Sequence, residues 1–110
     1  MEVKSKLSMD QFNQLLIQFP AALIYLYQED CGICTVLYPK VCEMLDKDFP
    51  KMEMIILHAE QNRELAAQIR MLSVPGIILY FDGKEFFRSA GVVTVSELKS
   101  RIGRLYEMFF

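Results

Sequence analysis

Two cysteines three positions apart carry the chemistry that this sequence predicts most clearly. Cys31 and Cys34 follow directly on the apolar run of residues 22–27 and its short polar exit. Two thiols at this spacing can exchange a disulfide, because the thiolate of one attacks a disulfide sulfur and the other then completes the exchange. In a reducing compartment the pattern favours redox chemistry or metal binding over a structural staple.

The expected position of the pair at the start of a helix assigns a role to each thiol. Unpaired backbone N–H groups and the helix dipole favour negative charge there, and the thiolate is the attacking species. We therefore expect Cys31 to be the nucleophile and Cys34, one turn later and more buried, to be the resolving thiol. Glu29 and Asp30 come directly before Cys31, and a carboxylate close to the sulfur would oppose the thiolate.

Four segments carry the spacing of helices that must position this pair. Capping boxes are predicted at the first helix, from Ser8 with Gln11, and at the last helix, from Thr94 with Glu97. Pro39 lies inside the second helix, where it removes a backbone hydrogen bond and should kink the chain. The predicted helices cover residues 8–19, 31–49, 62–71 and 94–109.

Apolar runs and turn residues predict the strands. Val3 is a weak signal for a first strand, and Asp82-Gly83 is a strong two-residue hairpin signal because both residues readily take positive φ. Alternation of strands with helices predicts parallel strands joined by right-handed crossovers. We expect an α/β fold in one domain, residues 1–110, with a mixed sheet, an antiparallel edge hairpin and helices on both faces. The other predicted strands are residues 22–27, 52–57, 77–81 and 85–89.

Composition and charge exclude several classes of function. The chain has 110 residues, of which 53% are apolar, so a core can form without disulfides. Its formal net charge is -2 and no basic stripe occurs, which argues against a nucleic-acid partner. Residues 1–11 lack the features of a signal peptide, and no stretch approaches the length of a membrane span. We expect a cytoplasmic protein with no membrane partner.

Metal binding is the main alternative for the cysteine pair. Zinc normally takes four ligands, and the chain offers this pair with Cys42 and His58. Cys42 follows Cys34 by eight residues on one predicted helix, which is about 12 Å along the axis, too far for a shared site or a disulfide. We expect no cofactor and no metal, and regard Cys42 as a small buried hydrophobe. Metal or iron–sulfur binding by the pair, including binding across a dimer, stays an alternative.

Four landmarks together make the sequence resemble the thioredoxin family, from about Ser8 to Phe109. The resemblance implies a thioredoxin-like fold and a protein-disulfide reductase, with protein disulfides as substrates and an upstream dithiol donor. One landmark alone would be weak evidence, but four in family-like order are hard to obtain by chance. They are the pair at 31–34, Pro39 five residues later, Val74-Pro75 before a strand, and the Asp82-Gly83 hairpin followed by Gly91.

The resemblance also implies a peptide-binding groove beside the cysteines. Pro75 would be preceded by a cis bond and would face the pair, and the backbone of Val74 would bind an extended substrate as an added strand. The groove-lining residues carried over in this way are Gly32, Ile33, Val74, Pro75, Gly76, Gly91 and Val92.

Several positions depart from the family's pattern. Ile33 replaces the proline between the cysteines, Asp30 replaces a tryptophan, and Gly76 replaces a threonine. Tyr25 stands where the family has a buried aspartate that assists proton transfer for the resolving cysteine, and Ile56 lies near the place of its lysine partner. These changes leave disulfide exchange chemically feasible.

Other side chains near the site have simpler interpretations. His58 or Glu60 could substitute as a proton relay, but we expect His58 to be a solvated residue at a strand end. Tyr25 and Tyr27 are interpreted as core or groove aromatics rather than catalysts.

Two functions therefore compete. The first is a thiol–disulfide oxidoreductase that reduces protein disulfides through Cys31 and Cys34. The alternative is a thioredoxin-like binding module with slow or vestigial redox activity, which the missing aspartate and lysine favour. We expect a monomer, with a dimer contact through the apolar residues 107–110 as the second option.

Overall fold

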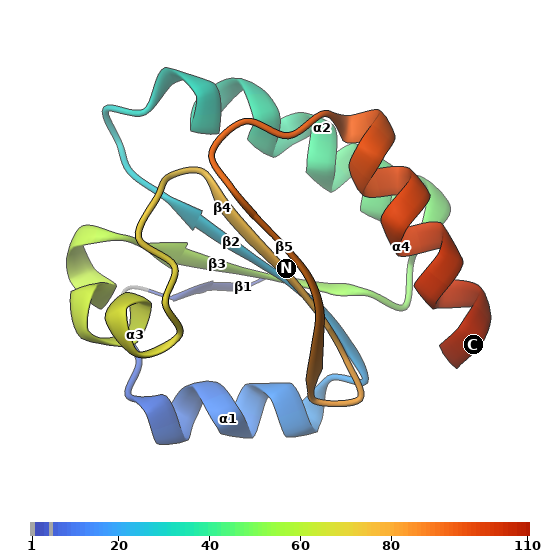
Figure 1. Cartoon of the computed structure of the whole chain (residues 1–110), viewed down its shortest axis with the longest axis horizontal. Helices are drawn as coiled ribbons and strands as arrows, with labels where there is room; N and C mark the ends of the chain where they lie inside the picture. Colours follow the sequence, from blue (N-terminus) through green and yellow to red (C-terminus); the bar gives the residue numbers. More distant parts are fainter. Residues whose placement is uncertain (1, 5) are drawn as a thin grey trace.

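The computed structural model describes residues 2–4 and 6–110, and a five-stranded sheet forms the middle of this described part (Figure 1). The strands follow the order β1-β3-β2-β4-β5 across the sheet. All the predicted strands are present, including the weakly signalled first one. Their bounds are β1 Glu2–Lys4, β2 Ala21–Tyr27, β3 Glu53–His58, β4 Gly76–Phe81 and β5 Lys84–Ala90.

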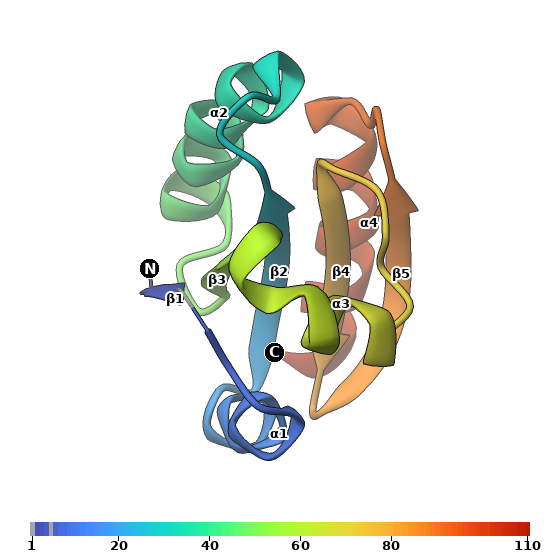
Figure 2. The ribbon, with the colours of Figure 1, turned by 90° about the vertical axis from the view of Figure 1, so that its left-hand side faces the viewer.

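Four α-helices in the described residues cover the two faces of the sheet. Figures 1 and 2 show α2 and α4 on one face and α1 and α3 on the other. The predicted mixed sheet with helices on both faces is thus confirmed. None of these helices is both long and apolar enough to cross a membrane. Their bounds are α1 Met9–Gln18, α2 Gly32–Asp48, α3 Arg63–Gln68 and α4 Val95–Phe109, with a 3-10 turn, η1, at Glu60–Asn62.

Local sequence signals account for the helix ends. The capping box at α1 is confirmed, since Ser8 Oγ accepts from the Gln11 N–H at 3.1 Å and Gln11 Oε1 accepts from the Ser8 N–H at 2.9 Å. At α4, Thr94 Oγ1 accepts from the Glu97 N–H at 3.1 Å. The third helix is shorter than predicted, and Arg70 just after it has a φ of 57°, which no helix continues through.

The direction of β4 differs from the prediction. Alternation predicted that β4 would run parallel to the earlier strands, but it is antiparallel to β2, with Gly76 opposite Leu26. The reason is the connection: β3 ends at His58, opposite Tyr27, so β3 ends and β4 begins at the same edge of the sheet. The 6 residues of α3 span about 9 Å, which is too short to carry the chain back along a strand of about 20 Å.

The two faces of the sheet bury two separate cores. Leu23 and Tyr25 point toward α2 and α4, whereas Ala22, Ile24 and Leu26 point toward α1 and α3. Side chains alternate in this way because successive strand residues face opposite sides. Burial on both faces explains why residues 22–27 read as one continuous apolar run.

The hairpin between β4 and β5 is confirmed at the predicted residues. Asp82 and Gly83 have φ values of 55° and 77°, the left-handed region that a two-residue turn of this kind requires. The turn makes β5 the outermost strand on that side of the sheet. β5 runs antiparallel to β4, so it ends next to the residue at which β4 began. Ala90 there pairs with Gly76.

Gly76, the first residue of β4, is closely surrounded by other atoms. A Cβ on Gly76 would lie 2.7 Å from Met71 Cγ and 2.9 Å from the Ser73 carbonyl oxygen. We predict that Gly76→Ala lowers the free energy of unfolding by about 1–3 kcal/mol, measured by urea denaturation, because the backbone oxygen must move. Gly103→Ala is the matched control, since outside its own helix the atom nearest to an added Cβ is Phe49 Cζ at 3.8 Å. That change should stabilise α4 by up to about 1 kcal/mol, and equal effects at the two sites would contradict this packing argument.

Candidate active site

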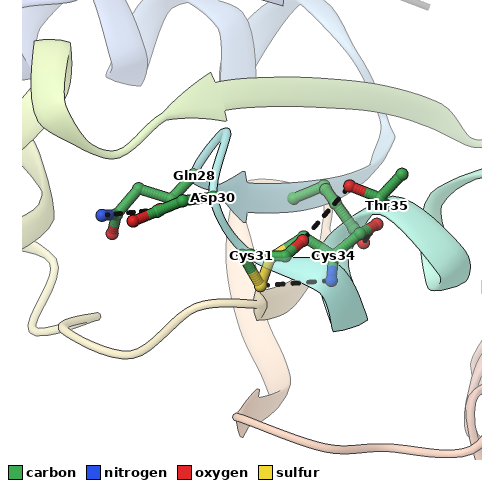
Figure 3. The surroundings of a disulfide bond; sticks show 6 residues. Gln28, Asp30, Cys31, Cys34 and Thr35 are labelled. Carbon is green, nitrogen blue, oxygen red and sulfur yellow. Dashed lines mark hydrogen bonds between the residues drawn. A yellow bond between two sulfur atoms is a disulfide. The ribbon is translucent and has the colours of Figure 1, made fainter.

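The cysteine pair forms a disulfide at the point where β2 gives way to α2 (Figure 3). The two Cα atoms are 5.3 Å apart. Cys31 is partly exposed, whereas Cys34 is 2% exposed. The structure therefore places one thiol within reach of a partner molecule and the other behind it.

Cys31 is the N-cap residue of α2. Its backbone is extended, with a φ of -94° and a ψ of 101°, and its Sγ accepts from the Cys34 N–H at 3.2 Å. An N-cap side chain normally offers an oxygen to these unpaired N–H groups. Here the sulfur takes that place, so the helix terminus stabilises negative charge on it.

Backbone contacts hold the N-cap in position. The Cys31 N–H donates to the Gln28 carbonyl at 3.2 Å, and the Thr35 N–H donates to the Cys31 carbonyl at 3.2 Å. Thr35 Oγ1 donates to the same Cys31 oxygen, also at 3.2 Å. The turn from β2 into α2 is thus braced on both sides of the nucleophile.

The acidic residues before the pair have other partners than the sulfur. Glu29 Oε1 lies 3.7 Å from His58 Nε2, and Asp30 Oδ1 accepts from Gln28 Nε2 at 3.5 Å. Figure 3 shows the Gln28 and Asp30 side chains directed away from the Cys31 sulfur. Both carboxylates are exposed, so solvent screens their charge. The two carboxylates therefore destabilise a Cys31 thiolate less than their positions in the sequence suggested.

His58 is not the solvated residue that was predicted. Its side chain is only 12% exposed, and its ring packs edge-on against Tyr27 with centroids 5.2 Å apart. The two residues are register partners on parallel strands, so their side chains lie on the same face and cover one another. Among the described residues, its buried Nδ1 has no hydrogen-bond partner.

Tyr25 contacts the resolving cysteine through its hydroxyl group. The Tyr25 O–H donates to the Cys34 carbonyl oxygen at 2.7 Å, and the ring is 1% exposed. Burial, with smaller contributions from Cys42 and Tyr38, raises the pKa of Tyr25 to about 12. Tyr25 is the core aromatic that was expected, but the contact with Cys34 was not foreseen. At neutral pH it stays protonated, so it cannot serve as an ionised base.

A cavity of about 300 Å³ adjoins Cys34 on the tyrosine side. Ile56, next to Tyr25 in the sheet, contributes to it in place of a charged partner. The resolving thiol therefore borders a hollow of hydroxyl and apolar groups. The lining residues are Tyr25, Tyr27, Cys34, Thr35, Tyr38 and Ile56.

Cys42 is half-buried rather than fully buried as expected. Its Sγ lies 3.7 Å from Met54 Sδ. Burial raises the pKa of Cys42, and a hydrogen bond with Tyr38 opposes that rise. In residues 2–4 and 6–110, no group of three or more His, Cys, Asp or Glu side chains is placed to hold a metal ion.

The residues predicted for the peptide groove meet at one edge of the sheet, but not all are exposed. The Val74–Pro75 bond is cis, and the Gly91 N–H donates to the Pro75 carbonyl at 2.9 Å with Gly91 at a φ of 99°. Val92 is exposed and Val74 is half-buried. Pro75 and Gly76 are both buried, so Gly76 in particular lies beneath the surface rather than lining it.

Arg88 is a residue that the sequence analysis missed. From β5 its guanidinium group makes two hydrogen bonds of 2.7 Å to Glu85, and it donates to the carbonyls of Arg70 at 2.8 Å and Ile69 at 3.0 Å. The hydrogen bond to Arg88 holds the pKa of Glu85 below its usual value. Arg88 thus fastens the end of α3, where the segment leading to Val74 begins.

Comparisons with known proteins agree with this geometry. A family model described as thioredoxin matches residues 3–104. The thioredoxin-like protein YdfQ of Bacillus subtilis is 26% identical over 102 residues, which cover 93% of this chain and 90% of that protein. Thioredoxin of Chlamydia muridarum is 33% identical over 82 residues, which cover 74% of this chain and 79% of that protein. The X-ray structure of Fasciola hepatica thioredoxin matches with a TM-score of 0.80 and 27% identity, covering 94% of this chain and 98% of that chain.

The pKa of Tyr25 predicts a loss of stability in strong alkali. An unfolded tyrosine ionises near 10.0 and the folded Tyr25 near 12, so between these values the unfolded chain binds fewer protons and stability falls as pH rises. We predict a steeper fall of the urea midpoint above pH 10 in the wild type than in Tyr25→Phe. Burial and Glu85, rather than Tyr25, raise the pKa of Tyr80, so Tyr80 contributes equally in both proteins. Parallel pH curves for the two proteins would show that Tyr25 is not the group responsible.

Removal of the Arg88 contacts should loosen the segment between α3 and β4. We predict that Arg88→Met lowers the free energy of unfolding by about 1–2 kcal/mol, since hydrogen bonds to a charged group are lost. It should also speed amide hydrogen exchange in residues 69–76. Arg104→Met is the control, because Arg104 is exposed on α4. Unchanged exchange in this segment would contradict an anchoring role for Arg88.

Proposed function

The chain belongs to the thioredoxin family, as a thiol–disulfide oxidoreductase with the pair Cys31–Cys34, and on that premise we propose that it reduces protein disulfides in the cytoplasm. The observation that carries this proposal is the partly exposed Cys31 Sγ at the N-terminus of α2, with the buried Cys34 behind it. The helix terminus favours the thiolate that attack requires.

In the first step the Cys31 thiolate attacks one sulfur of a substrate disulfide. A bond forms between Cys31 and that sulfur, and the second substrate sulfur leaves as a thiolate and takes up a proton. The Cys34 N–H, which meets Cys31 Sγ at 3.2 Å, stabilises the attacking charge. Cys31 is partly exposed and Cys34 is buried, so the substrate disulfide can reach Cys31 but not Cys34.

In the second step the Cys34 thiolate attacks Cys31 Sγ. The intramolecular disulfide forms and the substrate leaves as a dithiol, having gained two electrons and two protons. The Cα atoms of the two cysteines are 5.3 Å apart in one chain, so resolution is intramolecular and needs no second molecular encounter. An upstream dithiol donor then restores both thiols.

The environment of the resolving cysteine, Cys34, differs from the thioredoxin pattern. Tyr25 and Ile56 stand at or near the positions where that pattern has an aspartate and a lysine. Tyr25 keeps its proton at neutral pH, because its pKa is about 12, and Ile56 carries no charge. The proton of Cys34 would therefore pass to water rather than to a buried carboxylate. This observation favours a second candidate function, a binding module in which the same groove holds protein partners and redox turnover is slow.

The remaining features of the proposal concern partners and assembly. We infer that the substrate chain lies along Val74 and crosses the pair toward Gly91 and Val92, as an added strand would. A single domain of residues 1–110 acting as a monomer is sufficient for this chemistry, because both cysteines come from one chain.

Replacement of each cysteine separates the two functions. We predict that Cys31→Ser reduces insulin no faster than dithiothreitol alone, since the attacking sulfur is gone, and that Cys34→Ser accumulates a mixed disulfide with insulin, detected by mass spectrometry. Cys42→Ser is the matched control and should keep wild-type activity. If Cys31→Ser were as active as the wild type, the oxidoreductase mechanism would be wrong. If the wild type itself gave no turnover while partner capture survived in Cys31→Ser, the binding module would be supported.

A further inference from the structure

A second groove begins at the cysteine pair and runs between α2 and the segment that leads into α4. Its volume is about 800 Å³, and it starts at Gly32 and Ile33, which lie between the two cysteines. It is therefore continuous with the reactive site but lies on the α2 side, away from Val74. Its surface is mostly apolar. The lining side chains that matter here are Ile33, Val36, Leu37, Lys40, Val93 and Val95.

The spacing along α2 makes this groove one continuous strip. Val36 and Leu37 come three and four residues after Ile33, and Lys40 comes four and three residues after them, so the four side chains share one face of the helix. Ile33 is 51% exposed and Val36 is 59% exposed, whereas Leu37 is buried. Two exposed apolar side chains on the helix that begins at the partly exposed Cys31 leave apolar surface for a partner to cover.

Charge is confined to the far end of the strip. Lys40 is the charged residue among those that line the groove, and it is exposed. Farther along α2 lie Glu43 and Lys47, while Lys99 of α4 is paired with Asp48 at 3.4 Å. On the opposite side of the disulfide, the exposed groups are acidic, at Glu29 and Asp30. The groove thus runs from apolar residues near the disulfide to the cation Lys40, beyond which the charges on α2 are of both signs.

We propose that this strip binds the substrate polypeptide beside its disulfide and selects an apolar residue followed by a carboxylate. Lys40 lies nine residues beyond Cys31, or roughly 13 Å along the helix. An extended chain covers about 3.3 Å per residue, so the carboxylate stands three or four residues from the reacting cysteine. The inference rests on the proposed reductase function and adds a substrate class to it.

A polypeptide fits this surface better than a small molecule does. The groove is open, one end is the reactive disulfide, and its cationic end at Lys40 lies about 13 Å from Cys31 by helix geometry. A chain that is already tethered through a mixed disulfide at Cys31 brings its neighbouring residues into this strip at high effective concentration. Weak contacts with Ile33, Val36 and Lys40 are then sufficient to discriminate between substrates.

The test uses reduced full-length protein and short peptides whose single cysteine carries a 2-nitro-5-thiobenzoate group. The peptides share a leucine next to the cysteine and differ in having glutamate, glutamine or lysine three or four positions away, on either side. Release of the coloured thiol gives the second-order rate. Every rate is divided by the rate with hydroxyethyl disulfide, which is too small and uncharged to use the groove.

We expect the wild type to react about two- to fivefold faster with the glutamate peptide than with the lysine peptide, as for an exposed charge pair. Lys40→Glu should reverse this order, and the preference should shrink as salt rises. Lys84→Glu is the matched control, because Lys84 lies at the opposite edge of the sheet, beside the hairpin turn, and it should keep the wild-type order. Val36→Ser should lower the rate with the leucine peptides relative to peptides with serine in that position.

Two results would overturn the inference. One is a peptide preference that Lys40→Glu leaves unchanged, and the other is an equal change in Lys84→Glu, which would indicate net charge alone. A wild-type protein that fails to react with hydroxyethyl disulfide would instead overturn the reductase function, and this inference with it. The two failures are therefore distinguishable within one set of measurements.

Discussion

The hydrogen bond from the Cys34 N–H to the Cys31 sulfur is the interaction on which the site depends. It places a sulfur where a helix normally has an oxygen cap. Cys31 therefore caps the first turn of α2, and the N-terminus of the helix in turn stabilises negative charge on the Cys31 sulfur. The same geometry holds the second thiol one turn later, behind the first. The helix N-terminus thus stabilises the Cys31 thiolate, makes Cys31 the first sulfur to react, and holds Cys34 close enough to attack the mixed disulfide.

The sheet determines what surrounds this helix start. Because β3 ends and β4 begins at the edge where β2 ends, Val74, Gly91 and the cysteine pair gather there from three parts of the chain. Arg88 holds the approach to Val74 through two backbone carbonyls and Glu85. The reactive edge is therefore made of loops, but each loop is fixed by a strand register or by hydrogen bonds.

The interior behind Cys34 departs most from the family's pattern. Tyr25, whose pKa burial raises to about 12, donates a hydrogen bond to the Cys34 carbonyl, and Ile56 beside it is apolar. A charged pair has been replaced by groups that pack and donate but do not ionise at neutral pH. Disulfide exchange remains available, because it depends on the sulfurs and the helix terminus, while the route of the proton changes.

The sequence by itself determined the features that arise within a few residues of one another. These include the Ser8 cap, the Asp82-Gly83 turn, the strand that leads into the cysteine pair and the assignment of Cys31 to a helix start, because capping, turn conformation and periodicity are local properties. Only the tertiary structure decided the direction of β4, the burial of His58 and Gly76, the contact of Tyr25 with Cys34 and the attachment of Arg88 to the end of α3. Each of these depends on contacts between separate segments, whose meeting point is decided by how strands and connections pack together and not by the residues on either side.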